Sequence, residues 1–143
     1  MSIFSQIIEG KLPAHKIYED RFCIAILDLY PLTKGHTLLI PKEKAVTLDH
    51  LSEAASAELG RILPSLCRAI LKSTGAQNYH VLQNNGALAH QAIAQVHFHI
   101  IPKYESRQGL NFSWNSASLE ESEAIQISHG IREALKDLSL IHI

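Results

Sequence analysis

The sequence predicts an α+β fold in which a five-stranded antiparallel sheet carries a long helix on one face and precedes a C-terminal helix. Two observations lead to this fold class: one long segment has apolar residues at steps of three and four, and five short segments have the composition of strands. Several connections between strands are short, which favours antiparallel pairing. The chain of 143 residues has the size of one domain, so we expect a single domain over residues 1–143.

The first part of the chain is expected to form a short helix and three strands. Apolar residues at helical offsets predict one or two helical turns in the segment Ile3–Gly10. Extended runs over residues 16–19, 23–29 and 36–41 then predict three strands, because turn-forming residues separate them.

The main helix is predicted over residues 51–72, where apolar residues recur on one helical face. Ser52 is a plausible N-terminal cap, and Gly75 lies just past the expected end. Pro64 falls inside this segment and lacks a backbone donor, so we expect a kink or a split near residues 60–64.

Two further strands and a last helix complete the predicted order. The strands are expected at residues 79–83 and 95–103, with a turn and an irregular loop over residues 84–94 between them. A capping-box pattern over residues 118–121 precedes apolar residues at helical spacing, which predicts a C-terminal helix from there.

The composition excludes several classes of partner. The formal net charge is −1, so we expect no binding to nucleic acid or to an anionic membrane surface. No apolar run is long enough to cross a bilayer. Cys23 and Cys67 are the two cysteines, and no secretory leader precedes them, which predicts reduced thiols in a cytoplasmic protein, with the nucleus as a second compartment.

Histidines are numerous, and two of the nine lie close together in the last predicted strand. The two-residue period of a strand places His97 and His99 on one face, while Phe98 and its neighbours point toward the core under the long helix. This alternation alone is more typical of polar residues on a solvated sheet face than of a catalytic pair. His36 stands at the start of another predicted strand, and if the two strands are adjacent, three imidazoles share one pocket.

Several separate sequence blocks around these histidines occur in a familiar order and spacing. In chain order they are Ile3–Phe4, Ile7–Ile8, Leu12–Ala14, 23–28, 34–42 and 84–102. Together they resemble the histidine triad (HIT) superfamily, and within it the Hint branch of nucleoside phosphoramidases. The resemblance spans nearly the whole chain, and it implies a HIT-like fold and a purine nucleotide substrate, an AMP derivative.

The resemblance implies a specific role for each of the three histidines. His97 matches the middle triad histidine, which attacks the α-phosphorus of a nucleotide and forms a covalent nucleotidyl-imidazole that water hydrolyses. His99 matches the last triad histidine and would contact the α-phosphate oxygens, with His36 supporting the cluster. No cofactor and no metal ion are expected for this chemistry.

The chain departs from the family pattern at three positions near the triad. Gln95 occupies the first triad position in place of a histidine, Ala92 replaces a serine of the Hint branch, and His90 replaces a small residue. We expect activity to survive, because the orienting bond to Nδ1 of His97 can come from the backbone carbonyl at position 95. Leaving-group recognition is expected to differ.

The resemblance also assigns residues to nucleotide binding. Asp28 matches the carboxylate that accepts from both ribose hydroxyls, and Asn84 and Gln91 match polar contacts near the phosphate. The resemblance further implies an apolar wall around the purine. Taken without the resemblance, most of its residues would be assigned to the hydrophobic core. The wall consists of Ile3, Phe4, Ile7, Leu12, Leu27 and Leu29.

Three other functions remain open from the sequence. His36, His97 and His99 are able to supply three imidazoles to a zinc ion. A nucleotide-binding protein without turnover is motivated by Gln95 and Ala92. Hydrolysis of dinucleoside polyphosphates, as in the Fhit branch, is the alternative activity within the enzyme class.

A homodimer is implied by the resemblance, with the sheets of two subunits joined and the C-terminal segment reaching toward the partner's site. Trp114 lies in an otherwise irregular stretch and is a candidate interface residue because it is large and apolar. Covering the core of its own subunit is the alternative role for this side chain.

Overall fold

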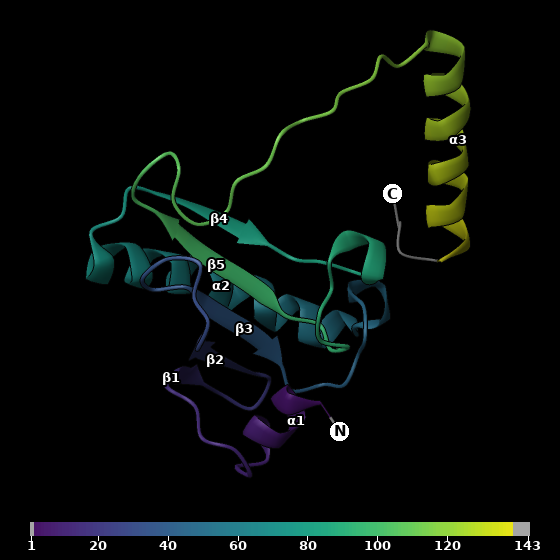
Figure 1. The fold of residues 1–143 in the computed structure, drawn as a ribbon. Coiled ribbons are helices and arrows are strands. Elements are labelled where there is room, and N and C mark those ends of the chain that lie inside the picture. The colour runs from purple at the N-terminus through teal and green to yellow at the C-terminus, as the bar shows by residue number, and fades with distance from the viewer. Residues whose placement is uncertain (1, 139–143) are drawn as a thin grey trace. The chain divides into compact units, whose positions relative to one another are not determined.

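The computed structural model describes residues 2–138 of the chain. They divide between Asn111 and Phe112 into two compact units, each of which is described by itself. The first unit contains the whole sheet and two helices, and the second contains the last helix (Figure 1). The expected single domain over the full chain stays a prediction.

A five-stranded antiparallel sheet forms the centre of the first unit, as predicted. Its strands are β1 (Lys16–Glu19), β2 (Cys23–Leu27), β3 (Thr37–Pro41), β4 (Asn78–Leu82) and β5 (Phe98–Lys103), arranged in the order β1-β2-β3-β5-β4. The predicted adjacency of the two histidine-bearing segments is confirmed, because β3 pairs directly with β5.

Two strands are shorter than predicted at the ends that carry functional residues. β2 ends at Leu27, because the Asp28 carboxylate accepts a hydrogen bond from the Tyr30 amide and turns the chain there. β5 begins only at Phe98, because the amide of Val96 bonds to Ala45 instead of joining the strand ladder. The functional residues at these two strand ends therefore lie in short segments that have their own backbone partners.

Helix α2 (Glu53–Thr74) covers one face of the sheet (Figure 1). The Ser52 side chain caps its first turn and Gly75 ends it with a φ of 77°, as predicted. Its buried face packs on alternate residues of the central strands in a single cluster of Cys23, Ala25, Leu39, Leu59, Ile62, Leu66, Cys67, Ile70 and Ile100.

The predicted split of this helix at Pro64 is wrong, because α2 continues through that residue. The Pro64 side chain is exposed, and the buried residues Ile62 and Leu66 on either side hold the helix against the sheet. Tertiary packing therefore outweighs the lost backbone donor.

The opposite face of the sheet packs against α1 (Ile3–Ile8). The cluster on that face consists of Phe4, Ile7, Ile24, Ile26, Leu38 and Ile40. His99 pairs across the strands with Leu38 and Leu82, so its side chain lies on the α1 side of the sheet. Phe98 and Ile100 pack on the α2 side, as predicted.

Helix α3 (Glu121–Asp137) belongs to the second unit. Its N-terminal cap is Glu120, without a side-chain cap hydrogen bond, so the predicted capping box beginning at Ser118 is wrong. None of the described residues of α3 is buried. Two single-turn 3₁₀ helices, Leu48–His50 and Ala87–Ala89, complete the elements.

Both cysteines carry free, buried thiols. In the part of the chain that the structure describes, no helix combines the length and the apolar character that a bilayer crossing needs.

Candidate active site

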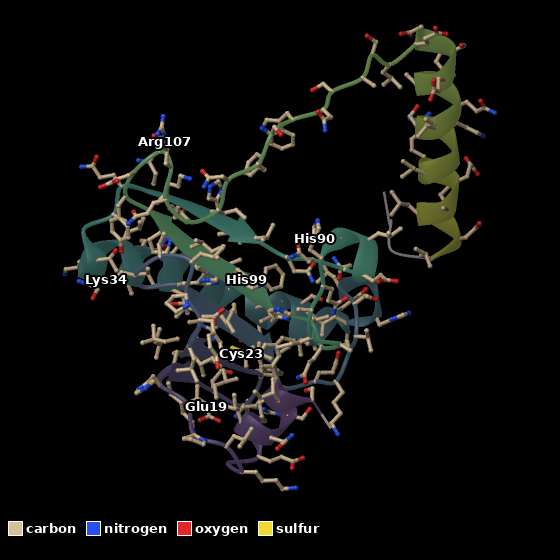
Figure 2. The ribbon with its side chains drawn as sticks, viewed as in Figure 1. Glu19, Cys23, Lys34, His90, His99 and Arg107 are labelled. Atoms are coloured by element: carbon tan, nitrogen blue, oxygen red, sulfur yellow. The ribbon has the colours of Figure 1, made fainter. Side chains whose placement is uncertain are left out.

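Three histidines meet on the sheet face that α1 covers. His36 precedes β3 and His99 lies in β5, and their Nε2 and Nδ1 atoms are 2.9 Å apart. The ring of His97 lies 4.9 Å from that of His99, centroid to centroid. The three imidazoles therefore lie together, and the label of His99 marks their position in Figure 2.

The hydrogen bond of His97 determines its tautomer. Its Nδ1 lies 2.7 Å from the backbone oxygen of Gln95. A carbonyl oxygen only accepts, so the proton of the neutral ring sits on Nδ1 and the Nε2 lone pair is free to attack. His97 is only 6% exposed, and this burial lowers its pKa below the ordinary value of 6.5, against the opposing effect of the Gln95 carbonyl.

A chain of hydrogen bonds gives His99 the opposite tautomer. The backbone amide of Leu32 donates to Nδ1 of His36 over 3.1 Å, so the His36 proton sits on Nε2. That Nε2–H donates to Nδ1 of His99, which leaves the His99 proton on its own Nε2. The cluster therefore offers a lone pair on one ring and an N–H donor on the next.

All three imidazoles are neutral at pH 7. Burial, with smaller contributions from the neighbouring rings of His97 and His36, lowers the pKa of His99 to about 4. Burial also lowers the pKa of His36, although the nearby Asp28 carboxylate opposes this shift. His99 thus donates hydrogen bonds as a neutral ring, through its tautomer rather than through a positive charge.

Asp28 lies at the edge of this cluster. Its Oδ2 is 3.6 Å from Nε2 of His36, and its Oδ1 accepts from the Tyr30 amide over 2.9 Å. The Asp28 side chain is 21% exposed, and each carboxylate oxygen keeps lone-pair capacity for further donors. The position therefore allows the predicted contact to ribose hydroxyls, while it also places a negative charge beside His36.

Three potential metal ligands also meet here, but they differ from the set expected from the sequence. Ligand atoms of Asp28, His36 and His99 lie within 4.8 Å of one another, with Asp28 in place of His97. Metal binding requires a lone pair on Nε2 of His36, whereas the Leu32 amide holds the proton on that atom. The described residues therefore fit a metal ion poorly in this tautomer.

Gln95 connects the site to the first helix. Its side chain is 4% exposed, and its Oε1 accepts from the hydroxyls of Ser2 at 2.5 Å and Ser5 at 3.1 Å. Its Nε2 donates to the Pro41 carbonyl over 3.5 Å. The two serines were missed from the sequence, where Ser2 carries only the signal of a helix cap.

The loop between β4 and β5 uses its polar side chains to hold itself together. Gln91 accepts from the Gly86 amide and donates to the carbonyls of Val46 and Ile93. Both amide hydrogens of Gln91 are therefore engaged within the protein, which limits its predicted phosphate contact to the remaining lone-pair capacity of Oε1. The loop has a structural task that the sequence pattern did not reveal.

Two further loop residues bear on the predicted contacts near the phosphate. Asn84 donates to the His90 carbonyl over 3.5 Å. His90 is exposed and, at a φ of 65°, adopts the left-handed conformation that non-glycine residues rarely take. Ala92 is also exposed. His90 is labelled in Figure 2.

The predicted apolar wall divides into buried and exposed members. Phe4 is buried and presents its ring to that of His97 at 4.9 Å between centroids and 68° between planes. Ile7 is part of the core. The other four side chains are at least 36% exposed, so core packing does not occupy them: Ile3, Leu12, Leu27 and Leu29.

Comparison with known proteins gives a consistent family. A model of the HIT domain matches residues 9–106. The chain is 41% identical to an adenosine 5'-monophosphoramidase of Schizosaccharomyces pombe, over 94% of this chain and 98% of that protein. It is 38% identical to an adenylylsulfatase of Arabidopsis thaliana, over 95% of this chain and 70% of that protein.

The fold agrees with a solved structure from the same comparison. A hypothetical protein from Leishmania major superposes with a TM-score of 0.90 and 39% identity, over 95% of this chain and 96% of that one. The family match includes β3 and β5 as well as His36, His97 and His99. The chain therefore belongs to the HIT family, in its Hint-like branch.

Proposed function

We propose that this HIT-family hydrolase cleaves the bond between the α-phosphate of AMP, or of another purine nucleoside monophosphate, and an amine leaving group. The observation that carries the proposal is the opposite tautomers of His97 and His99. They supply an unprotonated nucleophile beside a neutral donor, which is what attack on a phosphoryl centre needs. The related phosphoramidase of Schizosaccharomyces pombe supports the substrate class.

The reaction proceeds in two displacements. Nε2 of His97 attacks the α-phosphorus, a phosphorus–nitrogen bond to the imidazole forms, and the bond to the amine breaks. The amine leaves with a proton taken from solvent, because loss of its only ring proton would turn neutral His99 into an imidazolate anion. Water then attacks the nucleotidyl-imidazole, releases AMP, returns the proton and restores neutral His97.

The tautomers assign each ring its part in these steps. As His97 loses its lone pair to phosphorus, positive charge develops on the ring, and the bond from Nδ1–H to the Gln95 carbonyl strengthens. The Nε2–H of His99 stabilises the negative charge on the phosphoryl oxygens. Because the site is largely buried, these interactions are stronger than they are in water.

Nucleoside binding in this proposal uses Asp28 for the ribose hydroxyls and the exposed apolar side chains for the purine. Ile3, Leu27 and Leu29 remain available for contact with a ligand. Asn84, Gln91, His90 and Ala92 belong to the loop that borders the phosphate and the leaving group.

The test is release of AMP from adenosine phosphoramidate. We expect the native protein to release AMP and His97→Ala to release none above background. A short reaction quenched in denaturant is expected to leave one adenylyl group on the peptide that contains His97, detected by mass spectrometry. Absence of turnover by the folded native protein, shown together with AMP binding, would leave a nucleotide-binding protein without this activity.

Leaving-group choice is tested by comparing substrates. The adenylylsulfatase relative from Arabidopsis thaliana makes adenylyl sulfate the informative competitor, since it shares the α-phosphate and differs in the group that departs. We expect kcat/KM to be highest for AMP phosphoramidates. A higher value for diadenosine polyphosphates would favour the Fhit-like alternative.

We also propose a homodimer. β4 forms one edge of the sheet, where Tyr79 and Val81 are exposed, and an open strand edge favours pairing with a second chain. In the second unit, Trp114 is 82% exposed and is our candidate interface residue. Size-exclusion chromatography with light scattering is expected to give the mass of two chains, and a monomer mass would contradict the proposal.

A further inference from the structure

We propose that Gln95 is a positioning residue that ties the first turn of α1 to the nucleophile, with Ser2 and Ser5 as its partners. This inference deepens the proposed function and rests on it. The three residues would then influence nucleoside binding through α1, whereas the orientation of His97 depends on the backbone of residue 95.

Gln95 is connected in two directions at once. Its backbone oxygen accepts from Nδ1–H of His97 over 2.7 Å. Its side-chain Oε1 accepts two hydroxyl hydrogen bonds, from Ser2 and Ser5. An amide fits this environment because it presents an acceptor to the two hydroxyls and a donor to the Pro41 carbonyl.

Ser2 links this contact to the start of the helix. Its hydroxyl oxygen accepts from the Ser5 amide over 3.0 Å and so caps α1. The single hydroxyl proton of Ser2 is then directed to Gln95, which is the shorter of its two donor contacts. The beginning of α1 is therefore held in place by a buried side chain from the β4–β5 loop.

The position of α1 matters for the site because this helix carries ligand-facing side chains. Phe4 contacts the ring of His97 edge-on, and Ile3 in the same turn is exposed at 48%. If Gln95 releases Ser2 and Ser5, the first turn loses its anchor and Ile3 and Phe4 lose their fixed positions. The backbone bond from residue 95 to His97 stays, so chemistry is affected less than binding.

The choice of glutamine also makes this anchor independent of pH. A histidine at position 95 accepts from the serines only through an unprotonated ring nitrogen, and a protonated imidazole has two donors and no acceptor. Acidification would then break both hydroxyl bonds. A glutamine amide does not titrate, so the anchor persists over the whole pH range in which the protein is folded.

A double-mutant cycle tests the proposal. Gln95→Met removes the acceptor at similar size, Ser2→Ala with Ser5→Ala removes the donors, and the combined variant removes both. We expect each change to raise KM for adenosine phosphoramidate about fivefold to tenfold with kcat altered less than about threefold, and the combination to be no worse than either. Gln77→Met, the same change at an exposed position, is the matched control and should leave both constants unchanged.

Hydrogen exchange of residues 2–8 gives a readout that does not depend on turnover. We expect faster exchange there in Gln95→Met and in the serine variant, and native exchange in Gln77→Met. The inference would be overturned if Gln95→Met and the serine variant both showed native exchange rates. It would also be overturned if the rise in KM of the combined variant equalled the product of the rises in the two separate variants. If the native protein fails to turn over the phosphoramidate, the proposed function fails, while exchange and AMP affinity measured by calorimetry still decide the role of Gln95.

Measuring KM over a range of pH distinguishes a hydrogen-bond acceptor at position 95 from a side chain that only fills space. In Gln95→His, we expect KM to rise as the pH falls through the pKa of the new imidazole, while KM of the native protein stays level across that range. A pH-independent KM in Gln95→His would contradict the proposed acceptor role. The serine variant is substituted only at a helix end, so it keeps the test available if the Gln95 variants fold poorly.

Discussion

Two hydrogen bonds to backbone atoms determine which histidine of this site presents a free Nε2 lone pair. The carbonyl of Gln95 holds the proton of His97 on Nδ1, and the amide of Leu32 holds that of His36 on Nε2. Both partners belong to the main chain, so their side chains do not decide the outcome. A glutamine side chain at position 95 is therefore compatible with the observed orientation of His97.

The tautomers are directly measurable. In a protein labelled with ¹⁵N histidine, we expect His97 as the Nδ1–H form and His36 and His99 as Nε2–H forms at pH 7, because each ring has one obligatory partner. Two-bond ¹H–¹⁵N correlation spectra distinguish the forms. His129, which is exposed on α3, serves as the reference histidine in the same spectrum. The Nε2–H tautomer at His97 would disprove the assignment of the nucleophile.

The pH dependence of activity follows from the lowered pKa of His97. Only its neutral form attacks, and burial holds its pKa below 6.5. We expect the midpoint of the acid limb of kcat/KM for adenosine phosphoramidate to lie below pH 6.5, since that ratio reports the free enzyme. An acid limb centred above pH 6.5 would mean that His97 is not desolvated as described.

At the scale of elements, α2 shows how packing and local preference compete. The helix continues through Pro64 because buried residues on both sides hold it to the sheet. Gly60, one turn earlier, is exposed, and no neighbouring atom lies within 4 Å of the place that a Cβ would take there. The helix therefore carries two locally unfavourable residues on its solvent side.

Two glycine substitutions in and after α2 should have opposite effects. Gly60→Ala is expected to raise the free energy of unfolding by about 0.5–1 kcal/mol, because alanine loses less backbone entropy in a helix. Gly75→Ala is expected to lower it by about 1–2 kcal/mol, since the φ of 77° disfavours a side chain. Urea denaturation monitored by circular dichroism measures both, and equal signs would contradict the backbone argument.

At the scale of the whole molecule, the first unit holds two buried neutral histidines, His36 and His97, beside a partly buried one, His99. Their pKa values are lowered mainly by burial, so folding excludes protons from them. The unfolded chain binds those protons at its ordinary pKa of about 6.5. The neutral histidines that the proposed function needs therefore lower the stability of the fold at acid pH.

The expected consequence is a loss of stability on acidification. Below pH 6.5 the histidines bind protons in the unfolded state but stay largely unprotonated in the native state. The free energy of unfolding therefore falls from pH 6.5 toward pH 4, where His99 becomes protonated in the native state as well. His99→Gln is expected to reduce this slope, because glutamine does not titrate. Urea midpoints at a series of pH values test this, and a level profile in the native protein would refute it.

Local patterns were sufficient for the order of elements and for the family. The period of two in residues 97–100 and the helical period of α2 depend only on neighbouring residues, and both agree with the structure. Where residues near a boundary bond to distant backbone groups, as Val96 does to Ala45, the predicted strand was too long. The capping-box pattern at Ser118 failed for a related reason, because the side chain does not meet the amide that the pattern assumes.

The candidate site divides in the same way. The resemblance pointed to His36, His97 and His99, because several sequence blocks around them occur in the order and spacing of the family. Only the tertiary structure decided the tautomers and the anchor on α1, since His36 and His99 are 63 positions apart and Ser5 and Gln95 are 90. A hydrogen bond between residues that distant has no local pattern, because the folded sheet and loops alone bring its two atoms together.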